Sequence, residues 1–198
     1  MAQGRPRVRA LAWRSQIASP IMLVAGPSPR SAPAHETLRI SFGSDERTHL
    51  TDFIEQELRG RGHQVDLVGP PAGQPLQWTD VALAVARRVS NAESDAGVLC
   101  CWTGTGVSIA ANKLPGVRAA LCGDAETARG ARAWNDANLL CLSLRTTTEA
   151  LAKELLDAWF AATPDEEEAA NVEKLKEIDR RYRVRDAVPS AEGEKGRL

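Results

Sequence analysis

The residues best suited to chemistry lie near position 100, where an apolar run at positions 97–101 ends in two adjacent cysteines. A turn rich in threonine and glycine follows, and then an alanine-rich stretch compatible with a helix. This order of strand, turn and helix places the thiol of Cys101 beside backbone N–H groups that can hold an oxyanion. The pattern therefore predicts an active site centred on a thiol.

A thiol is mostly protonated at neutral pH, so a reactive Cys101 would need nearby donors to stabilise its thiolate. Adjacent residues of a strand point to opposite faces, so Cys100 is expected to fill the core. Burial in the core is also common for cysteine in general, and it stays an alternative interpretation of Cys101. The turn offers two kinds of donor: the hydroxyl of Thr103 and the backbone N–H groups of Gly104, Thr105 and Gly106.

The elements that would position this thiol alternate along the chain. Strands are expected at 38–42, 65–68, 97–101, 117–122 and 139–144, and helices at 50–58, 80–89, 108–114, 124–134, around 151–159 and at 166–182. The order predicts an α/β fold, a Rossmann-like three-layer sandwich whose five-stranded parallel sheet has helices on both faces plus a C-terminal helix. Sites in such folds lie at the carboxyl ends of the strands.

Composition favours one globular domain. The chain has 198 residues, 43% hydrophobic and 26% charged, which is enough for a single core. We expect the domain at 38–183, a disordered or non-native extension at 1–37 and a flexible tail at 184–198. The extension is rich in arginine and free of acidic residues up to position 35, so a transit or secretion signal is the alternative.

Charge, hydropathy and cysteine usage narrow the partners. Beyond position 35 acidic residues outnumber basic ones, which argues against nucleic acid, and no apolar run is long enough to span a membrane. The cysteines, at 100, 101, 122 and 141, lack disulfide-framework or metal-site spacing. We therefore expect a cytoplasmic protein without a metal, with Cys122 and Cys141 in the core.

Residues 97–113 closely resemble the strand–loop–helix motif of the type B ribose-5-phosphate isomerase family, which also contains galactose-6-phosphate isomerase subunits. Further matches lie at 43–45, 117–122, 135–138 and 144–145, in the order in which the family has them. The resemblance implies an aldose–ketose isomerase that acts on a sugar through an enediol and needs no cofactor. A dinucleotide site is not expected, because Ile109 stands where its fingerprint requires a small residue.

The resemblance also implies roles for single residues. Cys101 takes the position of the family's thiol base, and residues 103–106 would cradle the enediolate. Asp45 is expected to orient a sugar hydroxyl or ring oxygen, and Trp134 and Asn135 to make further substrate contacts. Arg145 is expected to meet a phosphate, with a surface ion pair as the alternative.

Several positions depart from the family's pattern. Trp134 replaces the histidine that opens the sugar ring, and an indole cannot transfer a proton at neutral pH. Glu46 replaces a histidine after the first strand, and the segment that follows is one residue shorter, so His49 cannot be assigned to the missing role. Trp102 replaces a glycine beside the thiol, and Trp78 stands where a tyrosine is usual.

The expected phosphate site is altered as well. Glu168 and Asn171 occupy positions where the family has arginines, which replaces attraction for a phosphate with repulsion. We therefore expect a sugar other than ribose 5-phosphate, with Trp78 and Trp102 offering apolar faces for a neutral ring.

The sequence thus predicts an aldose–ketose isomerase whose partners are a sugar or sugar phosphate and a second copy of the chain. In the helix at 166–182, Val172, Leu175 and Ile178 form an apolar stripe that would pack on a partner subunit, with packing on its own domain as the alternative. Two other functions stay open, a noncatalytic sugar- or metabolite-binding relative and an epimerase of the same fold.

Overall fold

The computed structural model describes residues 36–183, so most of the predicted extension and the whole predicted tail lie outside the described residues. A five-stranded parallel sheet of order β2-β1-β3-β5-β4 forms its centre. The strands are β1 (Arg39–Ser44), β2 (Gln64–Val68), β3 (Ala96–Cys101), β4 (Ala119–Leu121) and β5 (Leu139–Ser143). The sheet confirms the predicted fold.

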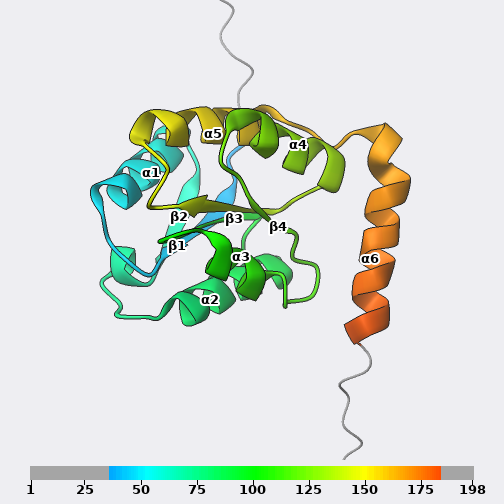
Figure 1. Ribbon diagram of the computed structural model, residues 1–198, viewed down its shortest axis with the longest axis horizontal. Helices are drawn as coiled ribbons and strands as arrows, with labels where there is room; N and C mark the ends of the chain where they lie inside the picture. Colours follow the sequence, from blue (N-terminus) through cyan, green and yellow to red (C-terminus); the bar gives the residue numbers. More distant parts are fainter. Residues whose placement is uncertain (1–35, 184–198) are drawn as a thin grey trace, which may run out of the picture. The chain divides into compact units, whose positions relative to one another are not determined.

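Helices cover both faces of this sheet, with α1, α4 and α5 on one face and α2 and α3 on the other (Figure 1). The helices are α1 (His49–Gly60), α2 (Trp78–Ser90), α3 (Thr105–Ala111), α4 (Ala125–Asn135), α5 (Glu149–Ala161) and α6 (Ala169–Arg183), with 3-10 turns η1 (Pro70–Ala72) and η2 (Glu166–Glu168). Among the described residues, no helix is long and apolar enough to cross a membrane.

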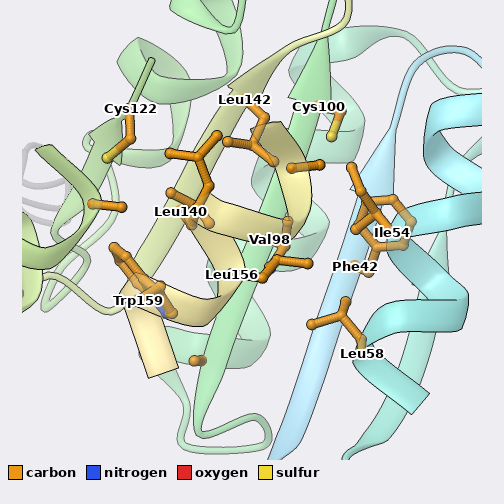
Figure 2. Packing of buried hydrophobic residues seen from close by; sticks show 14 of the residues in the cluster. Phe42, Ile54, Leu58, Val98, Cys100, Cys122, Leu140, Leu142, Leu156 and Trp159 are labelled. Carbon is orange, nitrogen blue, oxygen red and sulfur yellow. The ribbon is translucent and has the colours of Figure 1, made fainter. Parts of the chain in front are cut away.

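The core has two halves because the side chains of a strand alternate between faces. In β3, Val98 and Cys100 belong to the half covered by α1, α4 and α5, whereas Leu99 and Cys101 belong to the half covered by α2 and α3. Figure 2 shows Cys100 among the packed side chains of the first half. Adjacent cysteines therefore point to opposite faces, as predicted.

All four cysteines are buried and free. Cys122 and Cys141 are in the core, as predicted, with 1% and 0% of their surfaces exposed. Burial raises the pKa of Cys122 to about 12 and that of Cys141 well above its ordinary value. These two thiols are therefore inert packing groups.

Helix α3 differs most from the prediction, because it covers Thr105–Ala111 instead of 108–114. Gly104 has a φ of 73°, which turns the chain sharply enough for the helix to start at the next residue. At the other end, Asn112 leaves the helical pattern. Its side chain accepts a hydrogen bond from the N–H of Ala119 at 2.9 Å and donates one to the carbonyl of Ala119 at 2.8 Å. The backbone groups of Ala119, in the edge strand β4, are thus hydrogen-bonded to this side chain.

The last helical region is interrupted. The sequence predicts one helix over 166–182, but η2 ends at Glu168 and α6 begins at Ala169. Val172 is buried within its own chain, so only Leu175 and Ile178 of the predicted stripe remain exposed, at 42% and 46%. Tyr182 extends the exposed row at the end of the helix.

Candidate active site

The candidate site lies where β1, β3 and β5 end side by side. Ser44 of β1 is paired with Cys100, and Cys101 is paired with Ser143 of β5. The chain leaves β1 toward the face of α1, but it leaves β3 toward the opposite face, where α3 lies (Figure 1). Divergent connections of this kind open a crevice at the carboxyl edge of the sheet, where α/β proteins bind ligands.

Cys101 is the last residue of β3, at the carboxyl edge of the sheet. It is 6% exposed, whereas Cys100 is fully buried. The carbonyl of Cys101 accepts from the N–H groups of Leu144 at 3.0 Å and Gly104 at 3.2 Å, which fixes the backbone where the strand becomes the turn. Burial raises the pKa of the Cys100 thiol, so Cys100 cannot act as a base near neutral pH.

The turn after Cys101 is held in one conformation. Gly104 is required there because of its positive φ and because a Cβ atom would lie 2.5 Å from Cδ1 of Leu121 and 3.0 Å from the carbonyl oxygen of Leu142. The hydroxyls of Thr103 and Thr105 are hydrogen-bonded to each other at 2.6 Å.

This turn leads directly into α3, and the first N–H groups of a helix have no acceptor within it. Those of Thr105 and Gly106, the first two residues of α3, therefore remain available to a ligand. They lie a few residues from the Cys101 thiol along the chain, on the same side of the sheet. The structure thus places Cys101 at the end of β3 and the predicted backbone donors at the start of the helix that follows.

Asp45 follows β1 on the neighbouring side of the crevice. Its Oδ1 atom is buried and has no hydrogen-bond partner among the described residues. Removal from water raises the pKa of the Asp45 carboxyl, and the charge of Glu46 acts in the same direction. Asp45 directly follows Ser44, which is paired with Cys100, so Asp45 lies next to the end of β3. A buried acceptor without a partner is suited to a sugar hydroxyl.

Two predicted tryptophans flank the turn. Trp78 is the first residue of α2, is 41% exposed and lies against Gly106. Trp102 is 58% exposed, and its carbonyl accepts from the N–H of Arg145 at 3.0 Å and from the Ser143 hydroxyl at 3.0 Å. Both indoles are therefore accessible next to the turn that follows Cys101.

Arg145 comes shortly after β5, next to the Trp102 backbone. Its side chain is exposed, and within residues 36–183 no carboxylate forms an ion pair with it. The predicted alternative of a surface ion pair is thus not seen in the described part of the chain. The Arg145 guanidinium is therefore available to an anionic group of a ligand at the carboxyl edge.

Within one chain, Trp134 and Asn135 lie away from the residues at the carboxyl edge. They are the last two residues of α4, which begins after β4 and runs back to the amino end of the sheet. The loop that follows is tied to the segment before β4: Arg118 donates to the Asp136 carbonyl at 2.6 Å, and Asn138 to that of Gly116 at 2.8 Å. The predicted contacts of Trp134 and Asn135 with a substrate at Cys101 therefore cannot come from the same copy.

The acidic segment at 165–168 lies beside Trp134. The N–H of Asp165 donates to the Ala133 carbonyl at 2.8 Å, and an open pocket between α4, the end of α5 and η2 is lined by Arg129, Trp134 and Glu166, among others. The Arg129 guanidinium lies 5.3 Å from the Trp134 ring centre. Trp134 and the acidic segment thus lie together, away from Cys101 of the same chain, whereas Trp78 and Trp102 flank the turn after Cys101.

One contact at the carboxyl edge is not predictable from the sequence. Nδ1 of His49 lies 2.7 Å from Oε1 of Glu149, and these residues open α1 and α5. The partners are far apart in the sequence, so no local spacing could reveal them. As for metals, residues 36–183 contain no cluster of three or more His, Cys, Asp or Glu side chains able to hold an ion.

Comparison with known proteins supplies a family. The family model described as Ribose/Galactose Isomerase matches residues 40–178. Ribose-5-phosphate isomerase B of Escherichia coli K12 is 36% identical over 128 residues, which cover 63% of this chain and 84% of that protein. D-erythrulose-4-phosphate isomerase of Pectobacterium atrosepticum is 34% identical over 131 residues, with the same two coverages.

A solved structure agrees with these sequence matches. Ribose-5-phosphate isomerase B of Clostridium thermocellum superimposes with a TM-score of 0.67 at 37% identity, covering 73% of this chain and 99% of that one. The likeness therefore extends over nearly the whole of that chain.

Proposed function

Since the chain belongs to the ribose/galactose isomerase family, we propose that it is an aldose–ketose isomerase acting through a cis-enediol intermediate. The observation that supports the proposal is that β3 ends at Cys101 and α3 begins only four residues later, at Thr105, with the first N–H groups of the helix without an acceptor within it. Isomerisation needs a base beside donors that stabilise a developing oxyanion, and this edge of the sheet offers both.

In the proposed reaction, the Cys101 thiolate removes a proton from the carbon next to the sugar carbonyl. The electron pair moves onto the carbonyl oxygen, which takes a hydrogen bond from the N–H groups of Thr105 and Gly106, with the Thr103 hydroxyl nearby. A proton then passes from the O2 hydroxyl to O1, and return of the first proton from Cys101 to C1 gives the ketose and regenerates the thiolate. Asp45 accepts a hydrogen bond from a substrate hydroxyl and so fixes the sugar.

A homodimer completes the proposed site. Trp134 and Asn135 lie at the end of α4 remote from Cys101, so they can contact this substrate only from a second copy. Asn135, Leu175 and Ile178 line an open groove of about 360 Å³ between α6 and β4, which offers a partner an apolar surface. Free, buried cysteines are consistent with an enzyme of the cytoplasm.

The substrate we propose is a sugar other than ribose 5-phosphate. The relatives named above are isomerases of sugar phosphates. In this chain, however, Glu168 and Asn171 stand in the segment expected to bind phosphate. Arg145 is left as the proposed phosphate contact, since Arg47 at the same edge is paired with Asp52. Exposed indoles at Trp78 and Trp102 suit a less charged sugar ring.

Exchange of the C2 proton with deuterated water tests the proposal. The purified protein is incubated with pentoses and hexoses, free and phosphorylated, and deuterium at C2 is followed by NMR. We expect exchange with at least one sugar and its loss in Cys101→Ser. Binding without exchange would overturn the proposal in favour of a noncatalytic sugar-binding protein, and a product epimeric at C2 would favour an epimerase.

A further inference from the structure

The contact between His49 and Glu149 has no part in the proton transfer described above, although it lies at the same edge of the sheet. The geometry points to His49, held by Glu149, as the group that passes a proton to the ring oxygen and opens a cyclic sugar. This inference rests on the proposed isomerase function and adds a residue to it.

The geometry of the contact fixes the state of the imidazole. A carboxylate only accepts hydrogen bonds, so Nδ1 of His49 must carry the hydrogen that it shares with Oε1 of Glu149 at 2.7 Å. Nε2 is then left as the nitrogen that gains and loses a proton, and it bonds to no other group in the described part of the chain. The His49 side chain is 95% exposed, so Nε2 can reach a ligand.

The contact bridges the end of β3. β1 and β5 are the two neighbours of β3, and their ends lie about 10 Å apart because adjacent strands are about 4.8 Å from each other. His49 comes soon after β1, and Glu149 soon after β5. A direct bond between their side chains therefore joins the segments that follow the two neighbours of β3.

Both partners stand on well-defined helix starts. Thr48 caps α1, donating its N–H to the Thr51 hydroxyl at 2.8 Å and accepting from the Thr51 N–H. Thr148 caps α5 by accepting from the N–H of Leu151 at 3.2 Å. The imidazole is thus anchored on one side by α1 and on the other by the carboxylate of α5.

Ring opening needs such a group. A pentose or hexose is mostly a cyclic hemiacetal, and only its open form has the carbonyl that acidifies C2. The ring oxygen must gain a proton as its bond to C1 breaks, and histidine is the side chain that exchanges protons most readily near neutral pH. Of the two histidines among residues 36–183, His63 precedes β2 at the amino end of the sheet, whereas His49 lies at the carboxyl edge.

The step balances without any additional reactant. Protonated His49 gives its Nε2 proton to the ring oxygen while the bond from C1 to that oxygen breaks. The electrons of the anomeric O–H bond form the carbonyl, and the proton released returns to Nε2. Glu149 keeps its hydrogen bond to Nδ1 throughout and stabilises the charged imidazole. The open aldose then meets Cys101.

Sugars that cannot form a ring provide the test. D-erythrose 4-phosphate and D-glyceraldehyde lack a free hydroxyl placed to close a five-membered ring, so the proposed step is not needed for them. Exchange at C2 is measured for these two and for ring-forming sugars of matching phosphorylation, ribose 5-phosphate and ribose or xylose. In His49→Gln we expect exchange of the ring-forming sugars to fall about tenfold or more, with less than about a twofold change for the open-chain sugars.

Two further variants separate this role from a structural one. Glu149→Gln should give a smaller loss with the same preference for ring-forming sugars. Lys153→Gln, which removes the exposed ion pair with Asp157 one turn further along α5, should affect neither class. Equal rates in His49→Gln and the wild type, or an equal loss with both classes, would overturn the role of His49. Absence of exchange with every sugar in the wild type would instead refute the isomerase function itself.

Discussion

Gly106 lies directly against Trp78: a Cβ atom at Gly106 would be 3.0 Å from Cε3 of the indole and 3.2 Å from Cζ3. The Trp78 indole can therefore pack this closely against α3 because residue 106 has no side chain. Gly106→Ala should displace the indole and weaken sugar binding by about threefold to tenfold, which calorimetric titration would measure. Its melting temperature should change little, since alanine favours a helix.

Gly104→Ala is the contrasting control. At Gly104 the φ is 73°, and a Cβ atom would meet the backbone of Leu142, which cannot move without breaking β5. We expect a loss of about 2 kcal/mol or more in unfolding free energy, measured by denaturant titration. If Gly106→Ala destabilised the protein as much as Gly104→Ala, the assignment of Gly106 to positioning Trp78 would be wrong.

Cys101→Ser should lower C2 exchange by about a hundredfold or more while leaving sugar affinity nearly unchanged, because the loss lies in proton transfer. Cys100→Ser is the matched change on the other face of β3. It places a hydroxyl in the core and should cost about 1–3 kcal/mol in stability, with activity kept at temperatures where the variant is folded. Full exchange by Cys101→Ser would refute the assigned base.

Asp45→Asn tests the raised pKa of Asp45 through the pH dependence of stability, and the substrate contact of Asp45 through activity at neutral pH. Desolvation raises the pKa of Asp45, so the native state holds this proton more tightly than the unfolded chain does. The wild type therefore loses stability as the pH rises through the native pKa, and asparagine does not. We expect the melting temperature of Asp45→Asn, relative to wild type, to rise between about pH 3 and about pH 7.

At neutral pH the same variant should lose about tenfold in kcat/KM, because its amide is a weaker acceptor for a sugar hydroxyl. A relative melting temperature that falls as pH rises would contradict the raised pKa. Unchanged kcat/KM would contradict the substrate contact.

Local patterns in the sequence were enough to predict the sheet, the opposite faces of Cys100 and Cys101 and the thiol beside the turn, because strand alternation and glycine turns are local properties. The start of α3 was misplaced by three residues, since Thr105 and Gly106 look like loop residues until the φ of Gly104 is known. The pairing of His49 with Glu149 depends on which strands are neighbours. The separation of Asn135 from Cys101 depends on the direction of α4, which motif matching ignores.

Replacing Leu175 and Ile178 with glutamate should disrupt the proposed dimer. Both side chains are exposed on α6 and line the groove beside β4, so charge there would oppose burial by a partner. Light scattering at micromolar concentration should give a dimer for the wild type and a monomer for the double variant. Truncation after Pro164 should reduce both association and C2 exchange, and a monomeric wild type would rule the dimer out.

Phosphorylated sugars should bind more weakly than the free forms of the same sugars. The side chains of η2 are acidic, and positions 168 and 171 hold Glu and Asn where arginines are expected, so Arg145 is left to bind a phosphate. Repulsion of a phosphate at a partly shielded site corresponds to about a tenfold to hundredfold loss of affinity. Calorimetric titration of matched pairs, such as ribose and ribose 5-phosphate, measures this ratio directly. Glu168→Arg should shift it toward the phosphorylated form, whereas Glu177→Arg, an equal change of charge further along α6, should shift it less. Consistently tighter binding of phosphorylated sugars by the wild type would show that the phosphate site is intact and that the substrate is an ordinary sugar phosphate.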